Sequence, residues 1–149
     1  TQTVVKDNSV VIVPILRAGL GMVNGVHVLF PSARVGHIGM YRDEETLEPQ
    51  SYYCKLPVGI EDTLVLLVDP MLATGKSLAM CCQDLLINYN IKELHVAAII
   101  ASEEGLSYVK EALPEAIIWI GDLDKELTNK AYIVPGLGDA GDLAYGKKY

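Results

Sequence analysis

The chain has 149 residues, of which 50% are apolar, enough to bury one hydrophobic core. Its net charge of −7 and pI near 4.8 argue against a nucleic-acid partner or an anionic membrane surface, because both depend on clustered lysine and arginine. No apolar run approaches the roughly 18 residues of a membrane span and no signal sequence opens the chain, so we expect one soluble, cytoplasmic domain over residues 1–149.

The first predicted elements are a strand and a helix joined by a short turn. Residues 3–13 end in a β-branched apolar run and should form a buried strand that Pro14 ends. A helix is predicted from about Ala18 to Phe30. Its apolar face comprises Leu20, Val23, Val26 and Leu29. Arg17 then precedes a helix, where the dipole disfavours a cation, so a ligand role is favoured over a plain surface arginine.

An antiparallel hairpin is predicted next. Residues 33–41 and 51–55 are rich in aromatic and β-branched residues, and a charged segment that we expect to be mobile separates them. Arg42 opens this connection. From spacing alone, a solvated arginine paired with Asp43 or Glu45 is as good an interpretation as a ligand contact.

The stretch from Leu64 to Asn90 is the most informative part of the chain. Leu64–Val68 is apolar on both faces, as in the middle of a covered parallel sheet, and Asp69 follows at its carboxyl end, where such sheets bind ligands. The next residues offer the hydroxyls of Thr74 and Ser77, and a helix begins near Ser77. Its free backbone N–H groups and its dipole favour a phosphate.

Two phosphate chemistries compete for this loop. Gly75-Lys76-Ser77 matches the end of a nucleotide P-loop, but Pro70 replaces the first glycine and cannot supply the required turn. The interpretation of the chain as a kinase therefore holds only if the protein binds ATP. In the other interpretation the loop holds one monophosphate, and Asp69 meets ribose hydroxyls or a magnesium-bound sugar diphosphate.

Strands and helices continue to alternate in the last third of the chain. Strands are predicted over His95–Ile100 and Ala116–Ile120, with a helix over Glu103–Leu113 between them. This alternation predicts an α/β fold with a parallel sheet. Trp119 lies in an apolar strand and is expected in the core.

The segment Tyr132–Asp142 has a different character, because three glycines crowd around Pro135. We expect neither a regular helix nor a regular strand there. It is either a glycine-rich surface turn or a loop that brings backbone groups close to a flat ligand.

Three stretches together resemble the uracil phosphoribosyltransferase family, in order and over nearly the whole chain. They are Val13–Met22, Val68–Gly75 and Tyr132–Asp142. The resemblance implies a phosphoribosyltransferase-type core, namely a parallel sheet with helices on both faces, a β-hairpin insertion and a C-terminal glycine-rich hood loop.

The resemblance also assigns roles to individual residues. Arg17 and Asp139 are implied as catalytic. The expected contacts of 5-phosphoribosyl 1-diphosphate (PRPP) are Arg17, Arg42, Asp69, Pro70, Met71, Leu72, Ala73, Thr74, Gly75, Lys76, Ser77 and Asp139. The expected uracil contacts are Ile133, Gly138, Asp139 and Ala140.

The activity implied by the resemblance is transfer of the phosphoribosyl group from PRPP to uracil, which gives UMP and diphosphate in pyrimidine salvage. It further implies Mg²⁺ carried by PRPP without a direct protein ligand, a GTP effector, and a homodimer or homotetramer. Two alternatives remain open at this point. One is a nucleotide-sensing or regulatory module without turnover, and the other is transfer to a different base.

The chain departs from the family pattern in two places. The family's N-terminal portion of roughly sixty residues is missing, so we expect this chain to be less stable than a longer version. Lys76 stands where the family usually has glycine or another small residue. We expect Lys76 to begin the helix with ordinary backbone angles while Gly75 takes the unusual turn, which would let the ammonium reach the 5-phosphate.

Overall fold

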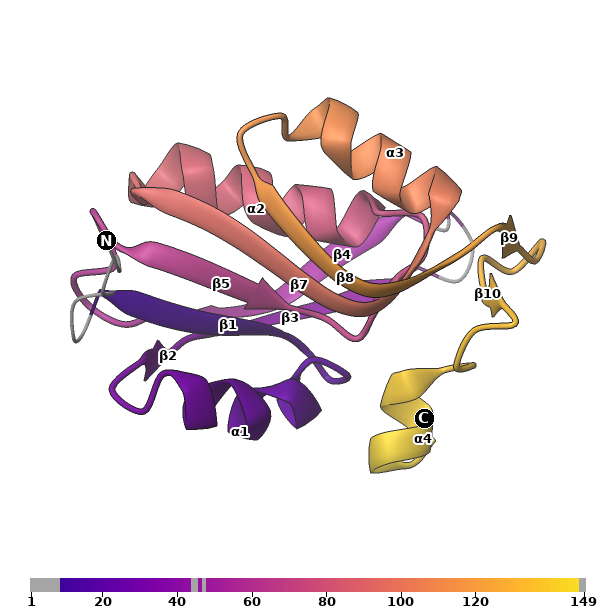
Figure 1. Cartoon of the computed structure of the whole chain (residues 1–149), viewed down its shortest axis with the longest axis horizontal. Coiled ribbons are helices and arrows are strands. Elements are labelled where there is room, and N and C mark those ends of the chain that lie inside the picture. Colours follow the sequence, from indigo (N-terminus) through magenta and orange to yellow (C-terminus); the bar gives the residue numbers. More distant parts are fainter. Residues whose placement is uncertain (1–8, 44–45, 47, 148–149) are drawn as a thin grey trace, which may run out of the picture.

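A parallel β-sheet forms the centre of the computed structural model, which describes residues 9–43, 46 and 48–147 (Figure 1). Within these residues the main path of the sheet is β4 (Pro49–Lys55), β3 (His37–Arg42), β1 (Val10–Leu16), β5 (Leu64–Val68), β7 (Glu93–Ser102) and β6 (Met71–Leu72). Two further strands attach to it, β2 (Arg34–Val35) beside β1 and β8 (Ile117–Asp124) beside β7. All these pairings are parallel except β3 with β4.

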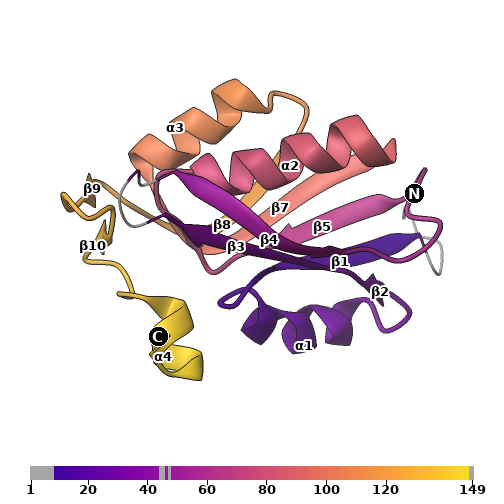
Figure 2. The ribbon, with the colours of Figure 1, turned by 180° about the vertical axis from the view of Figure 1, so that it is seen from behind.

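Helices cover both faces of this sheet, as expected. Helix α1 (Leu20–Leu29) lies on one face, and α2 (Lys76–Tyr89) and α3 (Glu103–Ala112) lie on the other (Figure 2). The C-terminal segment forms a small separate unit beyond the carboxyl ends of the strands (Figure 1). It consists of β9 (Glu126–Leu127), β10 (Ile133–Val134) and α4 (Ala140–Tyr145).

The core has two parts, one on each face of the sheet. The larger cluster joins β5 and β7 to α2 and α3, and Leu67, Val96 and Leu85 are completely buried in it. The smaller cluster joins β1 and β5 to α1 through Ile12, Val68 and Val23. Because β5 is packed on both sides, its apolar residues need no polar alternation. The fold class predicted from the sequence is therefore confirmed.

The first strand does not end at Pro14, which corrects the prediction. Strand β1 continues to Leu16, and Pro14 pairs with Val68 of β5. On the opposite side, the backbone N–H of Gly36 donates to the Ile12 carbonyl at 2.9 Å. The Pro14 nitrogen faces this same side, where the chain passes from β2 to β3. The missing N–H therefore falls in a gap of the ladder and costs little. Residues 3–8 of the predicted strand lie outside the described residues.

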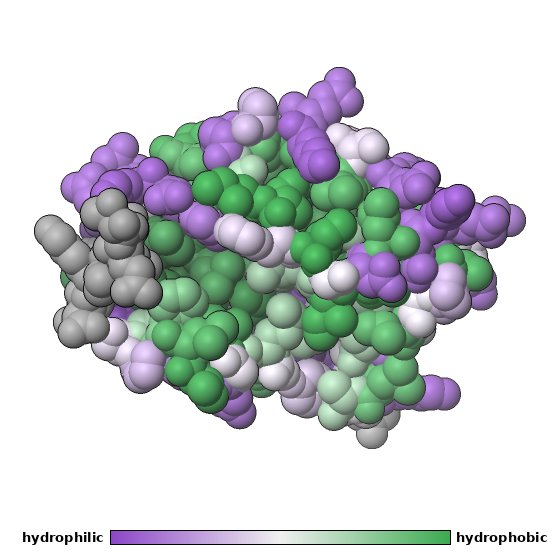
Figure 3. All heavy atoms as spheres, in the orientation of Figure 1, coloured by the Kyte–Doolittle hydropathy of each residue, from purple (hydrophilic) through white to green (hydrophobic). Residues whose placement is uncertain are grey.

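The prediction that Trp119 belongs to the core is wrong, since its side chain is 58% exposed. Helix α1 packs over β1 and β5, and its cover does not extend to β8. Trp119 instead lies flat beside His95, and its indole N–H donates to His95 Nδ1 at 3.0 Å. The ends of the predicted apolar face of α1 are likewise uncovered, with Leu20 41% and Leu29 74% exposed. Figure 3, in the orientation of Figure 1, shows apolar residues gathered across the middle of the visible face, between α3 and α1.

The predicted hairpin is confirmed as β3 and β4. Glu44, Glu45 and Leu47 of its connection lie outside the described residues, so the expected mobility of this segment stays a prediction. The segment Tyr132–Asp142 is more regular than predicted. Strand β10 pairs with β9, and α4 begins at Ala140. None of the described helices has the length and apolar character that crossing a membrane needs.

Candidate active site

Two loops meet at the carboxyl ends of the neighbouring strands β1 and β5. Residues 17–19 follow β1, and Asp69 follows β5. A Cβ at Gly19 would collide with the Val68 carbonyl oxygen and would lie 2.8 Å from backbone atoms of Ile15. Glycine therefore lets the first loop descend onto the strand that carries Asp69. The prediction that Arg17 lies in a strand-to-helix turn is confirmed.

The loop from Asp69 to Gly75 is supported from behind by β7 and α3. The backbone N–H groups of Ile99 and Ile100 donate to the Pro70 carbonyl at 3.1 and 3.0 Å, and β6 forms here as a two-residue strand that the sequence did not predict. The Ser102 hydroxyl donates to the Ala73 carbonyl at 2.6 Å. These bonds fix the loop against the sheet, so its free N–H groups and hydroxyls are held in place.

The turn into α2 has the geometry expected from the sequence. Gly75 has φ +76°, and Lys76, the first residue of α2, is not among the described residues with positive φ. A Cβ at Gly75 would lie 2.7 Å from Val109 Cγ2 and 2.8 Å from the Gly105 carbonyl oxygen. Glycine thus provides both the left-handed turn and the close packing on α3, and no strain falls on Lys76.

A pocket of about 80 Å³ lies over this loop. It is lined by Arg42, Asp69, Met71, Leu72, Ala73, Thr74, Gly75, Ser77 and Leu78. The structure thus brings the last residue of β3 together with the loop after β5, although 27 positions of sequence separate Arg42 from Asp69. Lys76 does not line the pocket. Its Nζ donates to Glu48 Oε1 at 3.0 Å on the surface.

Asp69 is the acidic group of the pocket. Burial raises the pKa of its carboxyl to about 7, although the Met71 backbone N–H, which donates to Oδ1 at 3.3 Å, favours the charged form. No cation is paired with it among the described residues. A ligand that brings hydroxyl donors or a bound cation would therefore stabilise its ionised form.

Arg17 lies outside the pocket lining and contacts α4 instead. Its Nη2 donates to Asp142 Oδ1 at 2.6 Å and to the Gly146 carbonyl at 3.0 Å. Asp139 Oδ1 accepts the backbone N–H of Asp142 at 2.8 Å and so caps the start of α4. The Asp139 carboxylate therefore faces the first turn of α4.

The hood, which we define as residues 126–146, carries the predicted uracil contacts. Ile133 is buried in β10, while Gly138 and Ala140 flank Asp139 at the start of α4. None of these residues lines the pocket over the phosphate loop. The structure therefore presents two groups of candidate residues, connected through Arg17.

Sequence reasoning missed three residues that build this site. Ser102 caps α3, and a serine before Glu103-Glu104 is a recognisable cap signal. Asp124 accepts the Gly136 N–H at 2.9 Å and shapes the hood. Asp142 pairs with Arg17 across 125 positions. No local pattern indicates the last two contacts, because each joins segments distant in sequence.

A model of the uracil phosphoribosyltransferase family matches residues 1–147. The chain belongs to this family. It is 54% identical over 143 residues to a uracil phosphoribosyltransferase of Wolinella succinogenes, covering 96% of this chain and 68% of the relative. It is 52% identical over 145 residues to one of Clostridium botulinum, covering 97% and 69%. The chain thus spans about two thirds of the length of these relatives.

Solved structures share the fold of this chain. The AQ2163 protein of Aquifex aeolicus is 40% identical, with a TM-score of 0.91 over 96% of this chain and 68% of that chain. A hypoxanthine phosphoribosyltransferase of Staphylococcus aureus is 15% identical with a TM-score of 0.59, over 80% and 64% of the two chains, and shows likeness of fold alone. The chain therefore has the phosphoribosyltransferase fold expected from the sequence.

Proposed function

We propose that this chain transfers the phosphoribosyl group from PRPP to uracil, giving UMP and diphosphate in pyrimidine salvage. The observation that carries the proposal is family membership at more than 50% identity to curated uracil phosphoribosyltransferases. The pocket is in keeping with it, because one acidic side chain, an arginine and a phosphate-binding loop converge there. No observation favours a regulatory module without turnover.

The loop from Asp69 to Ser77 is the proposed seat of the ribose 5-phosphate. The hydroxyls of Thr74 and Ser77 and the free N–H groups at the start of α2 can donate to phosphate oxygens. The remaining loop residues, Pro70, Met71, Leu72, Ala73, Gly75 and Lys76, provide backbone and shape. Asp69 accepts from the ribose hydroxyls, which is the role that an unpaired carboxyl beside a phosphate site can fill.

The departing diphosphate requires positive charge, since the chain has a net charge of −7. Arg17 and Arg42 are the proposed cations, and both lie on segments that end at the carboxyl edge of the sheet. Their hydrogen bonds to diphosphate oxygens strengthen as the bond to C1 breaks and charge accumulates on the leaving group. We therefore assign Arg17 a catalytic role, with Asp139 as the second catalytic residue.

Uracil binds to the hood in this proposal. Backbone groups around Ile133, Gly138 and Ala140 match the alternating donors and acceptors on one edge of the base. Asp139 approaches PRPP and assists loss of the proton from uracil N1, which attacks the electron-poor C1. To do so, its carboxylate gives up the hydrogen bond that it accepts from the Asp142 N–H and contacts the substrate instead. Positioning of the two substrates provides most of the rate.

Mg²⁺ is the proposed cofactor, and the residues present fit an ion that arrives with PRPP. Mg²⁺ ordinarily binds one or two carboxylates together with substrate phosphates. Asp69 is the carboxylate that lines the pocket and would face such an ion. When bound, the ion neutralises charge on the diphosphate.

Further properties of the proposal follow from the family resemblance alone. They are a GTP effector and assembly as a homodimer or homotetramer. Nucleic acid and membrane are not proposed partners, in keeping with the acidic composition.

The direct test measures UMP and diphosphate formation from uracil, PRPP and Mg²⁺ by the purified chain. We expect one diphosphate released for each UMP formed, and no product when either substrate is left out. Hypoxanthine and orotate serve as competing bases, and uracil should be preferred over each. Binding of PRPP without release of diphosphate in the presence of uracil would contradict the proposal and favour a sensing module.

A further inference from the structure

The ion pair between Arg17 and Asp142 joins the two halves of the proposed site. Arg17 lies in the loop after β1, and Asp142 lies in the first turn of α4. The side chains are 35% and 27% exposed, so both are partly shielded from water. A second acceptor, the Gly146 carbonyl, holds the same nitrogen at 3.0 Å. Two acceptors on one nitrogen fix the guanidinium more firmly than a single flexible surface pair would.

Around this ion pair, α4 lies beside the loop after β1 and the start of α1. A Cβ at Gly141 would lie 3.9 Å from Ala18 and 3.4 Å from Asp139 Oδ1. A Cβ at Gly21 would lie 3.4 Å from the Tyr145 hydroxyl, so α4 also runs beside the start of α1. No residue of α4 is buried, so the ion pair with Arg17 is the main contact that ties Asp142 to the loop after β1.

Only one side of the guanidinium is used by these bonds. Nη2 makes both of them, which leaves Nη1 and Nε without a hydrogen-bond partner among the described residues. Nη1 and Nε can therefore donate to an incoming anion while Nη2 remains bound to Asp142. An arginine held in this way is already oriented, so less side-chain entropy is lost when it binds diphosphate.

We propose that Asp142 is a positioning residue that orients Arg17 toward the diphosphate of PRPP and couples the hood to that binding event. The inference rests on the proposed function, which makes Arg17 a diphosphate ligand. The opposite interpretation treats Asp142 as an anion that competes with diphosphate for Arg17. The two differ in sign, because loss of the Asp142 charge weakens PRPP binding in the first case and strengthens it in the second.

The test is a double-mutant cycle in which calorimetry measures the affinity of each variant for PRPP. This measurement needs no turnover. The variants are Asp142→Asn, Arg17→Ala and the pair together. We expect Asp142→Asn to weaken PRPP binding about tenfold in the wild-type background and less than about twofold in the Arg17→Ala background. In steady-state assays the KM for PRPP should rise, and the KM for uracil should change less than about twofold.

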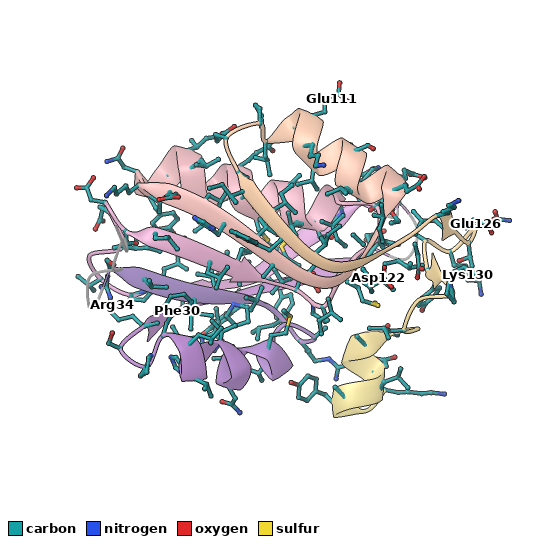
Figure 4. All side chains as sticks on the ribbon, in the orientation of Figure 1. Phe30, Arg34, Glu111, Asp122, Glu126 and Lys130 are labelled. Carbon is teal, nitrogen blue, oxygen red and sulfur yellow. The ribbon has the colours of Figure 1, made fainter. Side chains whose placement is uncertain are left out.

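Two controls separate positioning from other effects. Glu111→Gln removes the same charge from the outer side of α3, where Glu111 points away from the molecule (Figure 4), and should leave PRPP binding unchanged. Asp142→Glu keeps the charge and should stay within about threefold of wild type. Thermal melts of each variant show whether it is folded.

The inference is overturned if Asp142→Asn leaves PRPP binding unchanged or strengthens it, or if the loss is as large without Arg17 as with it. The inference is also overturned if Asp142→Glu is folded but binds PRPP as weakly as Arg17→Ala does. A chain that shows the coupling but forms no UMP would contradict the proposed function instead. A chain that forms UMP without the coupling would retain the function and lose the positioning role.

Discussion

Lys76 shows how one substituted residue can fit a loop without distorting it. Gly75 takes the left-handed turn with φ +76°, so Lys76 starts α2 without strain. That its ammonium reaches the 5-phosphate stays a prediction, and in the structure Nζ pairs with Glu48 at 3.0 Å. Lys76 nevertheless stands in the sequence between two residues that line the pocket, Gly75 and Ser77. Its charge should therefore favour PRPP binding by electrostatic attraction at a distance and not by direct contact.

We predict that Lys76→Gly raises the KM for PRPP about two- to threefold at low salt and less at high salt, with little change for uracil. The matched variant Glu48→Gln removes the surface partner of Lys76 and should lower the KM for PRPP. Steady-state kinetics at two ionic strengths measure both effects. Tighter PRPP binding by Lys76→Gly at every salt concentration would show that the lysine disturbs the loop.

Asp69 makes stability depend on pH. Burial raises the pKa of its carboxyl from 3.8 to about 7, so between these values the folded chain retains a proton that the unfolded chain has lost. The free energy of unfolding therefore falls as pH rises through this window and levels off above about 7. Asp69→Asn keeps the shape of the side chain but does not titrate.

We predict that the melting temperature of Asp69→Asn exceeds that of the wild type by a margin that grows from about pH 4 to about pH 7 and is then constant. Thermal melts of the ligand-free proteins across this range measure the margin. Asp84→Asn, on the exposed side of α2, is the control and should follow the wild type. A margin that does not change with pH would mean that Asp69 is ionised throughout.

At the scale of elements, the phosphate loop depends on how α2 and α3 pack together. Gly75 and Gly105 bring the loop backbone onto the first turn of α3, and Ser102 connects the two by bonds to the Ala73 carbonyl and the Gly105 N–H. The loop is therefore held by the rear helix as much as by its own strand.

We predict that Gly75→Ala destabilises the chain by about 1 kcal/mol or more and weakens PRPP binding, because the new Cβ combines positive φ with contacts to α3. Gly25→Ala is the matched control. Its site in α1 is open and helical, so it should stabilise the chain by about 0.5 to 1 kcal/mol. Urea unfolding and PRPP titration read the two effects, and equal stability of the two variants would refute the packing argument.

Ser102→Ala tests the second connection between loop and helix. The buried hydroxyl caps α3 and donates to Ala73 at 2.6 Å, so its removal leaves two backbone groups unpaired. We expect a loss of about 2 kcal/mol in the free energy of unfolding. Chemical denaturation measures it. Ser102→Thr, which keeps the hydroxyl, should recover part of the loss, and no loss in the alanine variant would contradict the cap assignment.

At the scale of the whole molecule, the chain divides into a well-packed sheet and a lightly attached hood. Strands β1 and β5 carry completely buried residues on both faces of the sheet, and β7 carries them on the face toward α2 and α3. The hood has a single residue, Ile133, among the buried apolar residues of the described chain, and it connects to the sheet loops mainly through Arg17. Regions with few buried contacts open most readily.

We predict that backbone deuterium exchange is slowest in β5 and β7 and fastest in residues 126–146. Addition of UMP should slow exchange in the hood and in residues 69–77, while residues 117–120 of β8, at the end away from the hood, stay unchanged. Exchange measured by mass spectrometry with and without UMP provides the comparison. Protection of β8 alone would place the nucleotide elsewhere.

The sequence alone determined the elements that rest on local physics. An apolar run on both faces identified β5 as a central strand, Asp69 marked its carboxyl end, and Gly75 beside Lys76 indicated where a left-handed turn would fall. These features follow from hydrophobic periodicity and backbone sterics within a few residues. The alternation of strands and helices then predicted the parallel sheet.

The tertiary structure decided which side chains are covered and which distant residues meet. Trp119 has the neighbours of a core residue in sequence, yet it is exposed because α1 packs over β1 and β5 instead of β8. Pro14 sits inside a strand because the ladder beside it has a gap between β2 and β3. Arg17 meets Asp142 only because β1 ends beside the hood. Such contacts depend on the order of strands in the sheet, which no short stretch of sequence specifies.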